Sequence, residues 1–370
     1  MFNCHQKWMK QAFLEALRSK GTTGKNPNVG CVIVKDNQII GRGRTSVFGR
    51  PHAEENALKS ISNSVSLNNS YMYLSLEPCA HKNKKQSSCA ELVSKSGVKN
   101  VFISNVDPDP RTSGRGIKIL IESGINVVTG LLEKEGKAIN AGFFSRINKR
   151  KPFITLKVGI SIDGKIALIN NNSKWITNQI SRNYSHLLRS QTDAILTSSN
   201  TILYDNSQLT CRLNGLSQFS PLKIVIDRNL KLTKSLQVFN SFFGEKTVIY
   251  YEKENKKLIN SFEPNNVTFR NINSFYNKEK GFWLSILNDI CEFGVNNLLI
   301  ESGPKFNNSL FKQKLIDEIA LFRSDKLIGN DGVPFLGDLK SVNIVDLNNY
   351  ELIESRSFDS DIYELRRLVK

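Results

Sequence analysis

The sequence predicts an α/β protein made of two successive domains. Three observations support this prediction. The chain has 370 residues, more than a single domain of about 150 residues needs. Short apolar runs alternate with amphipathic stretches, which favours sheets covered by helices. A charged segment ending at Pro152 interrupts the alternation, so we place the boundary after residue 145 and expect domains at 1–145 and 146–370.

The first domain is predicted to have three layers of helices and strands. Apolar residues at three- and four-residue spacing over 4–20, followed by Gly21, predict its first helix. A hairpin with a turn at 35–38 is expected next, over 29–40. The remaining elements are a helix from His52, strands at 71–76, 101–104 and 127–128, and helices through Leu92 and over 117–123.

The second domain is predicted to continue the α/β alternation. Strands are expected at 153–158, 194–197, 224–227, 247–250 and 297–301, with helices over 180–189 and 282–293. The stretch 252–280 is rich in Asn, Lys and Glu, and we interpret it as a surface excursion.

Composition and charge limit the classes of function. Hydrophobic residues make up 39% of the chain, enough for a large core, so a mainly disordered protein is excluded. No apolar run approaches the ~18 residues of a membrane span, and Met1–Lys7 shows no export signal. We therefore expect a cytoplasmic protein without a membrane partner. The net charge of +17 fits nucleic acid or an anionic small substrate.

The clearest chemical signal combines one histidine with two cysteines. The six cysteines are scattered, which in a protein without an export signal indicates a metal or redox site rather than disulfides. Zinc binds His nitrogen and Cys thiolate, and a catalytic zinc keeps three protein ligands so that water takes the fourth position. Two thiolates and a neutral imidazole also balance its charge. We therefore predict that His52, Cys79 and Cys89 bind a catalytic zinc ion.

Glu54 is the predicted proton carrier beside this metal. It follows His52 by two residues, about 200° around a regular helix. Because the two side chains do not share a lateral face, we expect the metal beyond the helix end, where side chains of the first turn converge. There Glu54 would take a proton from water and give it to a departing amino group, as in zinc-dependent nucleobase deaminases.

Two alternatives remain open at this point. His81 lies in the same loop as Cys79 and would close a structural zinc site, which would make the protein non-catalytic. The basic charge also fits a deaminase acting on nucleic acid such as tRNA, although no basic stripe with interleaved aromatic residues accompanies it. His5 and His186 lie on helical patterns without a partner, and we expect them to be surface or packing residues.

Four motifs of the first domain carry a family resemblance. They are Asn26–Gly30 (NPNVG), Pro51–Glu54 (PHAE), Leu76–His81 (LEPCAH) and Asp107–Pro110 (DPDP). They resemble the bifunctional deaminase–reductases of riboflavin biosynthesis, whose first domain is cytidine-deaminase-like. The resemblance implies zinc at His52, Cys79 and Cys89, a proton shuttle at Glu54 and a pyrimidine contact at Asn26. The family usually has Gly-x-Thr-Pro-Pro before the second thiolate, whereas residues 83–88 (NKKQSS) are one residue longer and lack proline.

The resemblance continues through the second domain. It rests on Thr155–Lys157, Ser161–Lys165, Ser173–Thr177, Leu187–Arg189, Asp193–Ile195, Thr201–Asp205, Leu209–Arg212 and Ile300–Pro304. This pattern is similar to the family's reductase domain, which has a dihydrofolate-reductase-like α/β fold and uses NADPH. From the residues alone, the turn after 297–301 would expose backbone N–H groups to a phosphate, and no Gly-x-Gly-x-x-Gly is present.

The resemblance also implies individual contacts in the reductase domain. NADPH would contact Gly159, Ser173, Trp175, Thr201, Asp205, Gly303, Pro304, Lys305, Phe306, Asn307, Asn308 and Ser309. The substrate would contact Arg189, Leu209, Arg212 and Glu301. Arg is suited to phosphate because its planar fork makes two parallel charge-assisted bonds, and Asp205 would assist proton transfer.

Together these observations predict a two-step enzyme. The first step is zinc-dependent hydrolytic deamination of 2,5-diamino-6-(5-phosphoribosylamino)pyrimidin-4-one. The second is NADPH-dependent reduction of the ribose to ribitol phosphate. The expected partner is the phosphorylated pyrimidine and not nucleic acid, and we expect a homo-oligomer.

Overall fold

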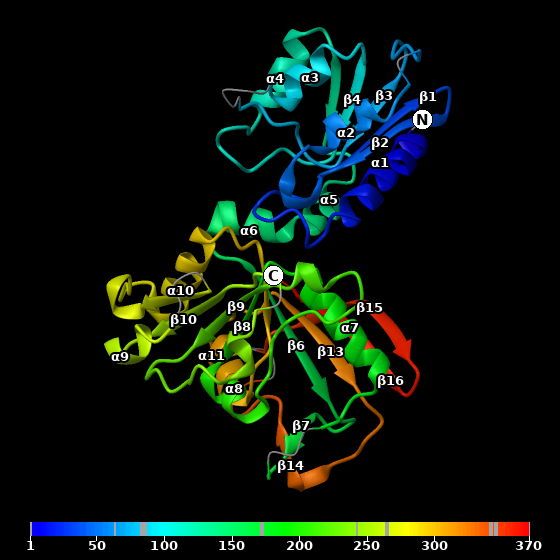
Figure 1. Ribbon diagram of the computed structural model, residues 1–370. Helices are drawn as coiled ribbons and strands as arrows, with labels where there is room; N and C mark the ends of the chain where they lie inside the picture. Colours follow the sequence, from blue (N-terminus) through cyan, green and yellow to red (C-terminus); the bar gives the residue numbers. More distant parts are fainter. Residues whose placement is uncertain are drawn as a thin grey trace. The chain divides into compact units, whose positions relative to one another are not determined.

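Two structural units, Met1–Arg150 and Lys151–Lys370, make up the chain (Figure 1). The computed structural model describes residues 2–62, 64–81, 87–170, 174–241, 243–262, 266–339, 343 and 347–369. The boundary expected after residue 145 falls inside helix α6 (Ala141–Lys149), and the units separate after this helix. Lys and Arg are good helix formers, so the charged segment interpreted as a linker extends α6 instead.

The first unit is built on a five-stranded sheet with the order β2-β1-β3-β4-β5. Its strands are β1 (Gly30–Lys35), β2 (Gln38–Arg44), β3 (Tyr71–Leu74), β4 (Asn100–Ile103) and β5 (Asn126–Thr129). β1 is antiparallel to β2 and β3, whereas β3, β4 and β5 run parallel. The carboxyl ends of these parallel strands therefore lie at one edge of the sheet.

Helices cover both faces of this sheet, as the three-layer prediction requires. They are α1 (Phe2–Leu17), α2 (Ala53–Lys59), α3 (Cys89–Ser94), α4 (Arg115–Glu122), α5 (Glu133–Ile139) and the 3-10 turn η1 (Val47–Gly49). Val32 of β1 packs with Met9 of α1 on one face, and Ile33 packs with Ala57 of α2 on the other. α1 lies so close to β1 that a Cβ at Gly30 would be 1.9 Å from the Ala12 carbonyl oxygen.

The second unit contains a nine-stranded sheet with the order β11-β10-β9-β8-β12-β6-β13-β16-β15. Its strands are β6 (Phe153–Ile160), β8 (Ala194–Ser198), β9 (Leu222–Ile226), β10 (Thr247–Tyr251), β11 (Val267–Asn271), β12 (Asn297–Ile300), β13 (Glu318–Arg323), β15 (Tyr350–Phe358) and β16 (Asp361–Leu368). The strands from β11 to β13 are parallel, and the hairpin β15–β16 pairs antiparallel to β13. A separate pair joins β7 (Lys165–Leu168) to β14 (Gly332–Pro334).

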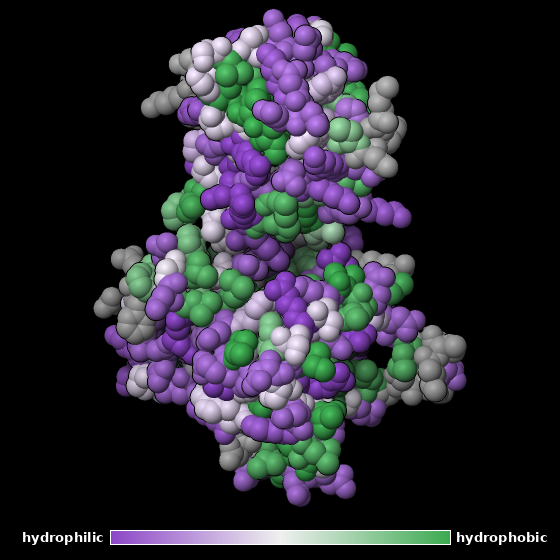
Figure 2. All heavy atoms as spheres, turned by 90° about the vertical axis from the view of Figure 1, so that its right-hand side faces the viewer, coloured by the Kyte–Doolittle hydropathy of each residue, from purple (hydrophilic) through white to green (hydrophobic). Residues whose placement is uncertain are grey.

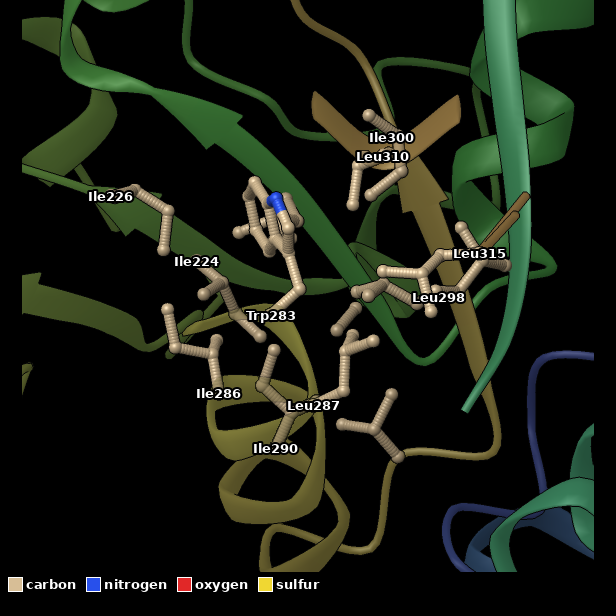
Figure 3. Packing of buried hydrophobic residues seen from close by; sticks show 14 of the residues in the cluster. Ile224, Ile226, Trp283, Ile286, Leu287, Ile290, Leu298, Ile300, Leu310 and Leu315 are labelled. Carbon is tan, nitrogen blue, oxygen red and sulfur yellow. The ribbon is translucent and has the colours of Figure 1, made fainter. Parts of the chain in front are cut away.

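The core of this unit forms where helices pack on the sheet. The helices are α7 (Gln179–Ser190), α8 (Ser199–Asp205), α9 (Lys256–Ile259), α10 (Gly281–Glu292) and α11 (Pro304–Lys312), with 3-10 turns η2 (Ser217–Phe219), η3 (Gln237–Phe239), η4 (Ile272–Ser274) and η5 (Gly329–Asp331). Figure 3 shows Trp283 and Ile286 of α10 beside Ile224 of β9. Burying each such side chain stabilises the fold by about 1.5–3 kcal/mol.

Several features of this unit differ from the sequence-based expectation, which did not include the inner strand β13 or the pair β7–β14. The stretch 252–280, predicted to be a surface excursion, contains β11 at one edge of the sheet. An edge strand tolerates polar and charged residues, which hid it in an Asn- and Lys-rich stretch. The hairpin β15–β16 was not predicted. Its strand β15 is the other edge and is mostly exposed.

The surface mixes polar and apolar residues. On the face in Figure 2, hydrophobic residues form separate groups among hydrophilic ones. Over the described ranges, every helix is too short or too polar to cross a bilayer.

Candidate active sites

His52, Cys79 and Cys89 converge in the first unit, and two helix ends bring them there. His52 is the N-cap residue of α2, and Cys89 is the first residue of α3. Cys79 lies in the loop after β3 and accepts a hydrogen bond from the Cys89 amide over 3.4 Å. The Nδ1 atom of His52 lies 3.2 Å from Cys89 Sγ and 3.6 Å from Cys79 Sγ.

These distances fit a zinc ion. Zn–N bonds of about 2.0–2.1 Å and Zn–S bonds of about 2.3 Å at a tetrahedral centre separate the ligand atoms by about 3.6–3.8 Å. Candidate ligand atoms of the three residues all lie within 4.8 Å of one another. Zinc is also the metal that one imidazole and two thiolates favour. The predicted donor set is therefore present with the spacing that zinc requires.

The two thiols and the imidazole shift one another's protonation. A hydrogen bond from Cys89 lowers the pKa of Cys79 to about 4, and the same contact raises the pKa of Cys89. Burial opposes the charged form of His52, but its hydrogen bond with Cys79 and the charge of Glu54 outweigh burial and raise its pKa. The arrangement therefore favours a thiolate at Cys79.

Glu54 lies in the first turn of α2, next to this group. Its side chain is buried. Burial is the main cause of its raised pKa, and the negative charge of Cys79 adds to the effect. A carboxyl group with a raised pKa can hold a proton nearer neutral pH. Because His52 precedes the helix in an extended conformation (φ −78°, ψ 168°), both side chains reach the helix end, as predicted from their spacing.

Glu77, two residues before Cys79, makes contacts that its motif did not predict. Its carboxylate is 3% exposed. It accepts hydrogen bonds from four backbone amides: Asp107 (3.1 Å), Gly114 (3.0 Å), Gly116 (2.9 Å) and Ile117 (3.2 Å). The amides of Gly116 and Ile117 belong to the first turn of α4, where a negative charge is favoured. Glu77 thus ties the loop before α4 to the loop that carries Cys79.

The close approach of these two loops requires glycine. A Cβ at Gly116 would lie 2.1 Å from the Pro78 carbonyl oxygen. Any larger residue would push the first turn of α4 away from the segment between Glu77 and Cys79. The Gly-Arg-Gly sequence over 114–116, at the start of α4, is the signal that points to this contact.

Asn26, the predicted pyrimidine contact, lies against the segment that leads to His52. Gly49 has φ +92°, and a Cβ there would be 1.9 Å from Asn26 Nδ2. Asn26 Nδ2 donates to the Thr23 carbonyl oxygen over 3.3 Å. The structure therefore places Asn26 beside the loop that carries the histidine ligand.

His81 does not belong to the metal group. Its Nδ1 lies 3.4 Å from Thr112 Oγ1, and the cluster found among the described residues consists of His52, Cys79 and Cys89 alone. The alternative of a zinc site closed by His81 therefore has no support in this geometry. Residues 82–86, most of the segment that departs from the family pattern, lie outside the described residues.

In the second unit, an ion cluster surrounds Glu301, which directly follows β12. Arg189 Nε and Nη2 donate to its two carboxylate oxygens over 2.8 and 2.9 Å. Lys157 Nζ lies 3.7 Å from the Oε2 atom of Glu301. Burial opposes ionisation of Glu301, but the charges of Arg189 and Lys157 outweigh it and lower its pKa to about 2. Two of the predicted substrate residues, Arg189 and Glu301, thus form one largely buried pair.

Strand register explains why these residues meet. Ile300 of β12 pairs with Leu156 of β6 and with Leu196 of β8. The next residues along the three strands are therefore neighbours at the carboxyl edge of the sheet. Thr197, at one of these positions, donates through Oγ1 to the Glu301 carbonyl oxygen over 2.6 Å. Ligands of parallel α/β sheets bind beyond this edge.

The segment Leu209–Arg212 lies against the same cluster. Arg189 Nη1 donates to the Thr210 carbonyl oxygen over 3.0 Å, and His186 Nδ1 lies 3.1 Å from that oxygen. Leu209 is buried with φ +59°. The expectation that His5 and His186 lack partners is wrong, because His5 Nδ1 lies 2.8 Å from the Tyr73 hydroxyl. Both partners are distant in sequence, so helical periodicity did not reveal them.

The predicted cofactor residues fall into two groups, one within residues 159–205 and the other in the turn Gly303–Ser309. Trp175 is 60% exposed with the Arg182 guanidinium 4.5 Å from its ring centre, and Asp205 is exposed at the end of α8. Thr201 lies in α8, where its Oγ1 is 3.1 Å from the capping Ser198 Oγ. Gly159 lies in β6, where a Cβ would approach the Thr177 methyl group at 3.3 Å. Ser173 lies outside the described residues.

The predicted cofactor turn Gly303–Ser309 forms the start of α11. Gly303 is its N-cap and Pro304 its first residue, so the amides of the first turn are available to an anion. Asn307, by contrast, is buried and donates to the Phe335 carbonyl oxygen over 3.2 Å. Ser309 accepts from Trp283 Nε1 over 3.1 Å. The polar groups of these last two residues are thus used inside the protein.

Both units match known protein families. Residues 2–105 match the cytidine and deoxycytidylate deaminase zinc-binding region, and residues 152–363 match the RibD C-terminal domain. "Riboflavin biosynthesis protein RibD" of Aquifex aeolicus is 34% identical over 334 residues, which cover 90% of each chain. The Escherichia coli protein of that name is 32% identical over 96% of this chain and 97% of its own.

Solved structures agree over the full length. Acinetobacter baumannii RibD has a TM-score of 0.88 and 28% identity, with 100% of each chain covered. A diaminohydroxyphosphoribosylaminopyrimidine deaminase/5-amino-6-(5-phosphoribosylamino)uracil reductase from Thermotoga maritima has a TM-score of 0.87 and 30% identity, covering 100% of this chain and 99% of its own.

The fold and the metal group define a zinc-binding deaminase unit followed by an α/β reductase unit. Relatives that are 32–34% identical cover at least 90% of the chain, so the family of the whole chain can be stated. The chain belongs to the RibD family of riboflavin biosynthesis proteins. It is a bifunctional deaminase and reductase that uses zinc and NADPH.

Proposed function

We propose that the first unit deaminates 2,5-diamino-6-(5-phosphoribosylamino)pyrimidin-4-one and that the second reduces the ribose of the product to ribitol phosphate. The observation that carries this proposal is the convergence of His52, Cys79 and Cys89 beside the buried Glu54. The names of the relatives support the choice of substrate. That of the Thermotoga protein states both a deaminase and a reductase acting on phosphoribosylamino-pyrimidines.

In the first unit, His52, Cys79 and Cys89 would hold the zinc ion. When bound, zinc lowers the pKa of water from 15.7 to about 7 and so supplies a nucleophile near neutral pH. Glu54 takes a proton from the attacking water and passes it to the departing amino group, so that ammonia leaves. Its burial favours the protonated carboxyl that this transfer requires.

Two loops would frame the pyrimidine in this unit. Asn26 lies against Gly49 in the segment leading to His52, where its amide group would contact the ring. Glu77 fixes the position of the loop over 105–114 relative to Cys79. We assign Glu77 a positioning role, because its carboxylate is fully occupied by backbone amides.

In the second unit, the cluster around Glu301 would bind the phosphoribosyl group. NADPH, when bound, supplies the hydride that reduces the sugar carbon. Arg189, Leu209, Arg212 and Glu301 would contact the substrate. Gly159, Ser173, Trp175, Thr201, Asp205 and the start of α11 over 303–309 would contact NADPH. Support comes from the position of Glu301 at the carboxyl edge of the parallel strands, and Asp205 would assist proton transfer as the sugar opens.

We infer further that the enzyme works in the cytoplasm as a homo-oligomer, on a free phosphorylated pyrimidine rather than on nucleic acid or at a membrane. The assignment of both units to small-molecule chemistry supports this choice. Sedimentation of the purified protein tests the oligomeric state. Salt-dependent binding to tRNA would contradict the choice of substrate.

The two steps can be tested separately in the purified protein. Ammonia release is followed with the diamino substrate, and NADPH oxidation with the deaminated product. We expect Glu54→Gln to retain zinc, to lose ammonia release by about 10²–10⁴-fold and to oxidise NADPH normally. Normal deamination by Glu54→Gln would contradict the role proposed for Glu54.

A further inference from the structure

His186 is a half-buried residue of α7 that neither step described above uses. It lies one helical turn before Arg189, so both side chains leave the same face of the helix. Its Nδ1 is 3.1 Å from the Thr210 carbonyl oxygen, to which Arg189 also donates. The charges of Arg189, Arg212 and Glu301 all act on the imidazole. His186 is therefore part of the cluster in the second unit.

The contact with Thr210 determines which ring nitrogen carries the hydrogen. A carbonyl oxygen can only accept a hydrogen bond, so Nδ1 is the N–H group and Nε2 of the neutral ring is an acceptor. Burial and the charges of Arg189 and Arg212 lower the pKa of His186 to about 4. The ring is consequently neutral at pH 7. Among the described residues, none hydrogen-bonds to Nε2.

The cluster offers many donors and few acceptors. Arg189, Arg212 and Lys157 are cations that only donate. Both carboxylate oxygens of Glu301 accept from Arg189, and the Thr210 carbonyl already serves two donors. These donors suit a phosphate, but the hydroxyl groups of a sugar also need acceptors. Nε2 of His186 can meet this need, and its direction is fixed by the bond at the opposite nitrogen.

We propose that Nε2 of His186 accepts a hydrogen bond from a sugar hydroxyl of the substrate and thereby positions the sugar chain for reduction, a role that rests on the reductase function proposed above. His186 is then a specificity-determining residue. A substrate without that hydroxyl would leave Nε2 unpaired and bind less tightly. Losing one neutral hydrogen bond corresponds to about a 10-fold change in affinity.

Two amide variants separate this role from a packing role. The amide of His186→Asn lies where Nδ1 is and can still donate to Thr210, but places nothing at Nε2. The amide of His186→Gln reaches the place of Nε2 and can accept from a hydroxyl, while giving up the Thr210 contact. We expect the KM for the deaminated substrate to rise about 10-fold in His186→Asn and to change at most about 2-fold in His186→Gln. A packing role predicts the reverse order.

The deaminated substrate is supplied directly, so that reduction is measured alone. Calorimetry with the ribityl product, without NADPH, should show the same order of affinities. NADPH affinity and ammonia release should match the wild type in both variants. If the wild type reduces the substrate and His186→Asn has an unchanged KM, the role of His186 is overturned by itself. If the wild type does not oxidise NADPH, the proposed reductase function is overturned together with this role.

Discussion

The two sites balance their buried charges in different ways. In the first unit, His52, Cys79 and Cys89 bring together two sulfur ligands, and the cation that would balance them as thiolates is a metal from outside the chain. In the second unit, Glu301 is balanced by Arg189 and Lys157 of the chain itself. The first site should therefore depend on its metal for activity and local stability, whereas the ion cluster stands without a ligand.

Loss of one zinc ligand should have the largest effect. We expect Cys89→Ser to reduce zinc content and to lower ammonia release by more than the roughly 100-fold cost of losing an outer-shell partner. NADPH oxidation with the deaminated substrate should be unchanged, because the second unit has its own charge balance. Metal analysis and the two separate assays measure this. Cys4→Ser, at an exposed cysteine, is the matched control and should retain zinc and both activities.

Breaking the ion pair of the second unit should have the next largest effect. Arg189→Met leaves the largely buried Glu301 with Lys157 as its remaining ion-pair partner, and we expect the free energy of unfolding of this unit to fall by about 3–5 kcal/mol. Reduction should be lost while zinc content and ammonia release persist. The double variant Arg189→Met/Glu301→Gln should regain much of the stability but none of the reduction. Denaturant titration measures the stability of both variants. An equal loss of unfolding free energy in the single and the double variant would contradict the charge-pair account.

Replacing Glu77 should have a smaller effect than replacing a zinc ligand, but a larger effect than replacing an exposed acidic residue. Glu77→Gln replaces an acceptor of four amides by a group with only one carbonyl oxygen. The cost should be about 1–3 kcal/mol in the first unit, with lower deamination and zinc retained. Glu122→Gln, on the exposed end of α4, should change stability by less than about 0.5 kcal/mol. Equal effects of the two variants would remove the positioning role.

Mild acid, near pH 6, should affect the second unit through His186 with the smallest effect of the four. The pKa of His186 is lowered to about 4 by burial and by two arginines, whereas the unfolded chain has an ordinary value near 6.5. Between these values the unfolded state binds more protons, so stability is full above pH 6.5 and falls as the pH drops towards 4. His186→Asn should remove this part of the pH dependence. An identical pH profile in that variant would contradict the shift.

The metal site was largely predictable from the sequence, because its chemistry lies in short motifs. His52 and Glu54 are two residues apart, and Pro78 directly precedes Cys79. The supporting contacts were not predictable in the same way. The amides that bind Glu77 lie 30–40 residues further along the chain, and only the fold brings them together.

The fold shows the same difference between features marked by local sequence and features set by long-range contacts. Apolar runs marked β6 and most of the other inner strands of both sheets, but the inner strand β13 and the pair β7–β14 were not predicted. The edge strands β11 and β15 escaped, because an edge strand is half exposed and its polar residues resemble those of a loop. Long-range pairing, rather than local propensity, sets these elements in place.

X-ray absorption at the zinc edge of the purified protein tests the central claim most directly. A site made by His52, Cys79 and Cys89 should show two sulfur atoms at about 2.3 Å and two lighter atoms at about 2.0 Å, one from the histidine and one from solvent. Cys89→Ser should lose one sulfur. A spectrum with three or four sulfur atoms, or with a second histidine in place of solvent, would contradict the account.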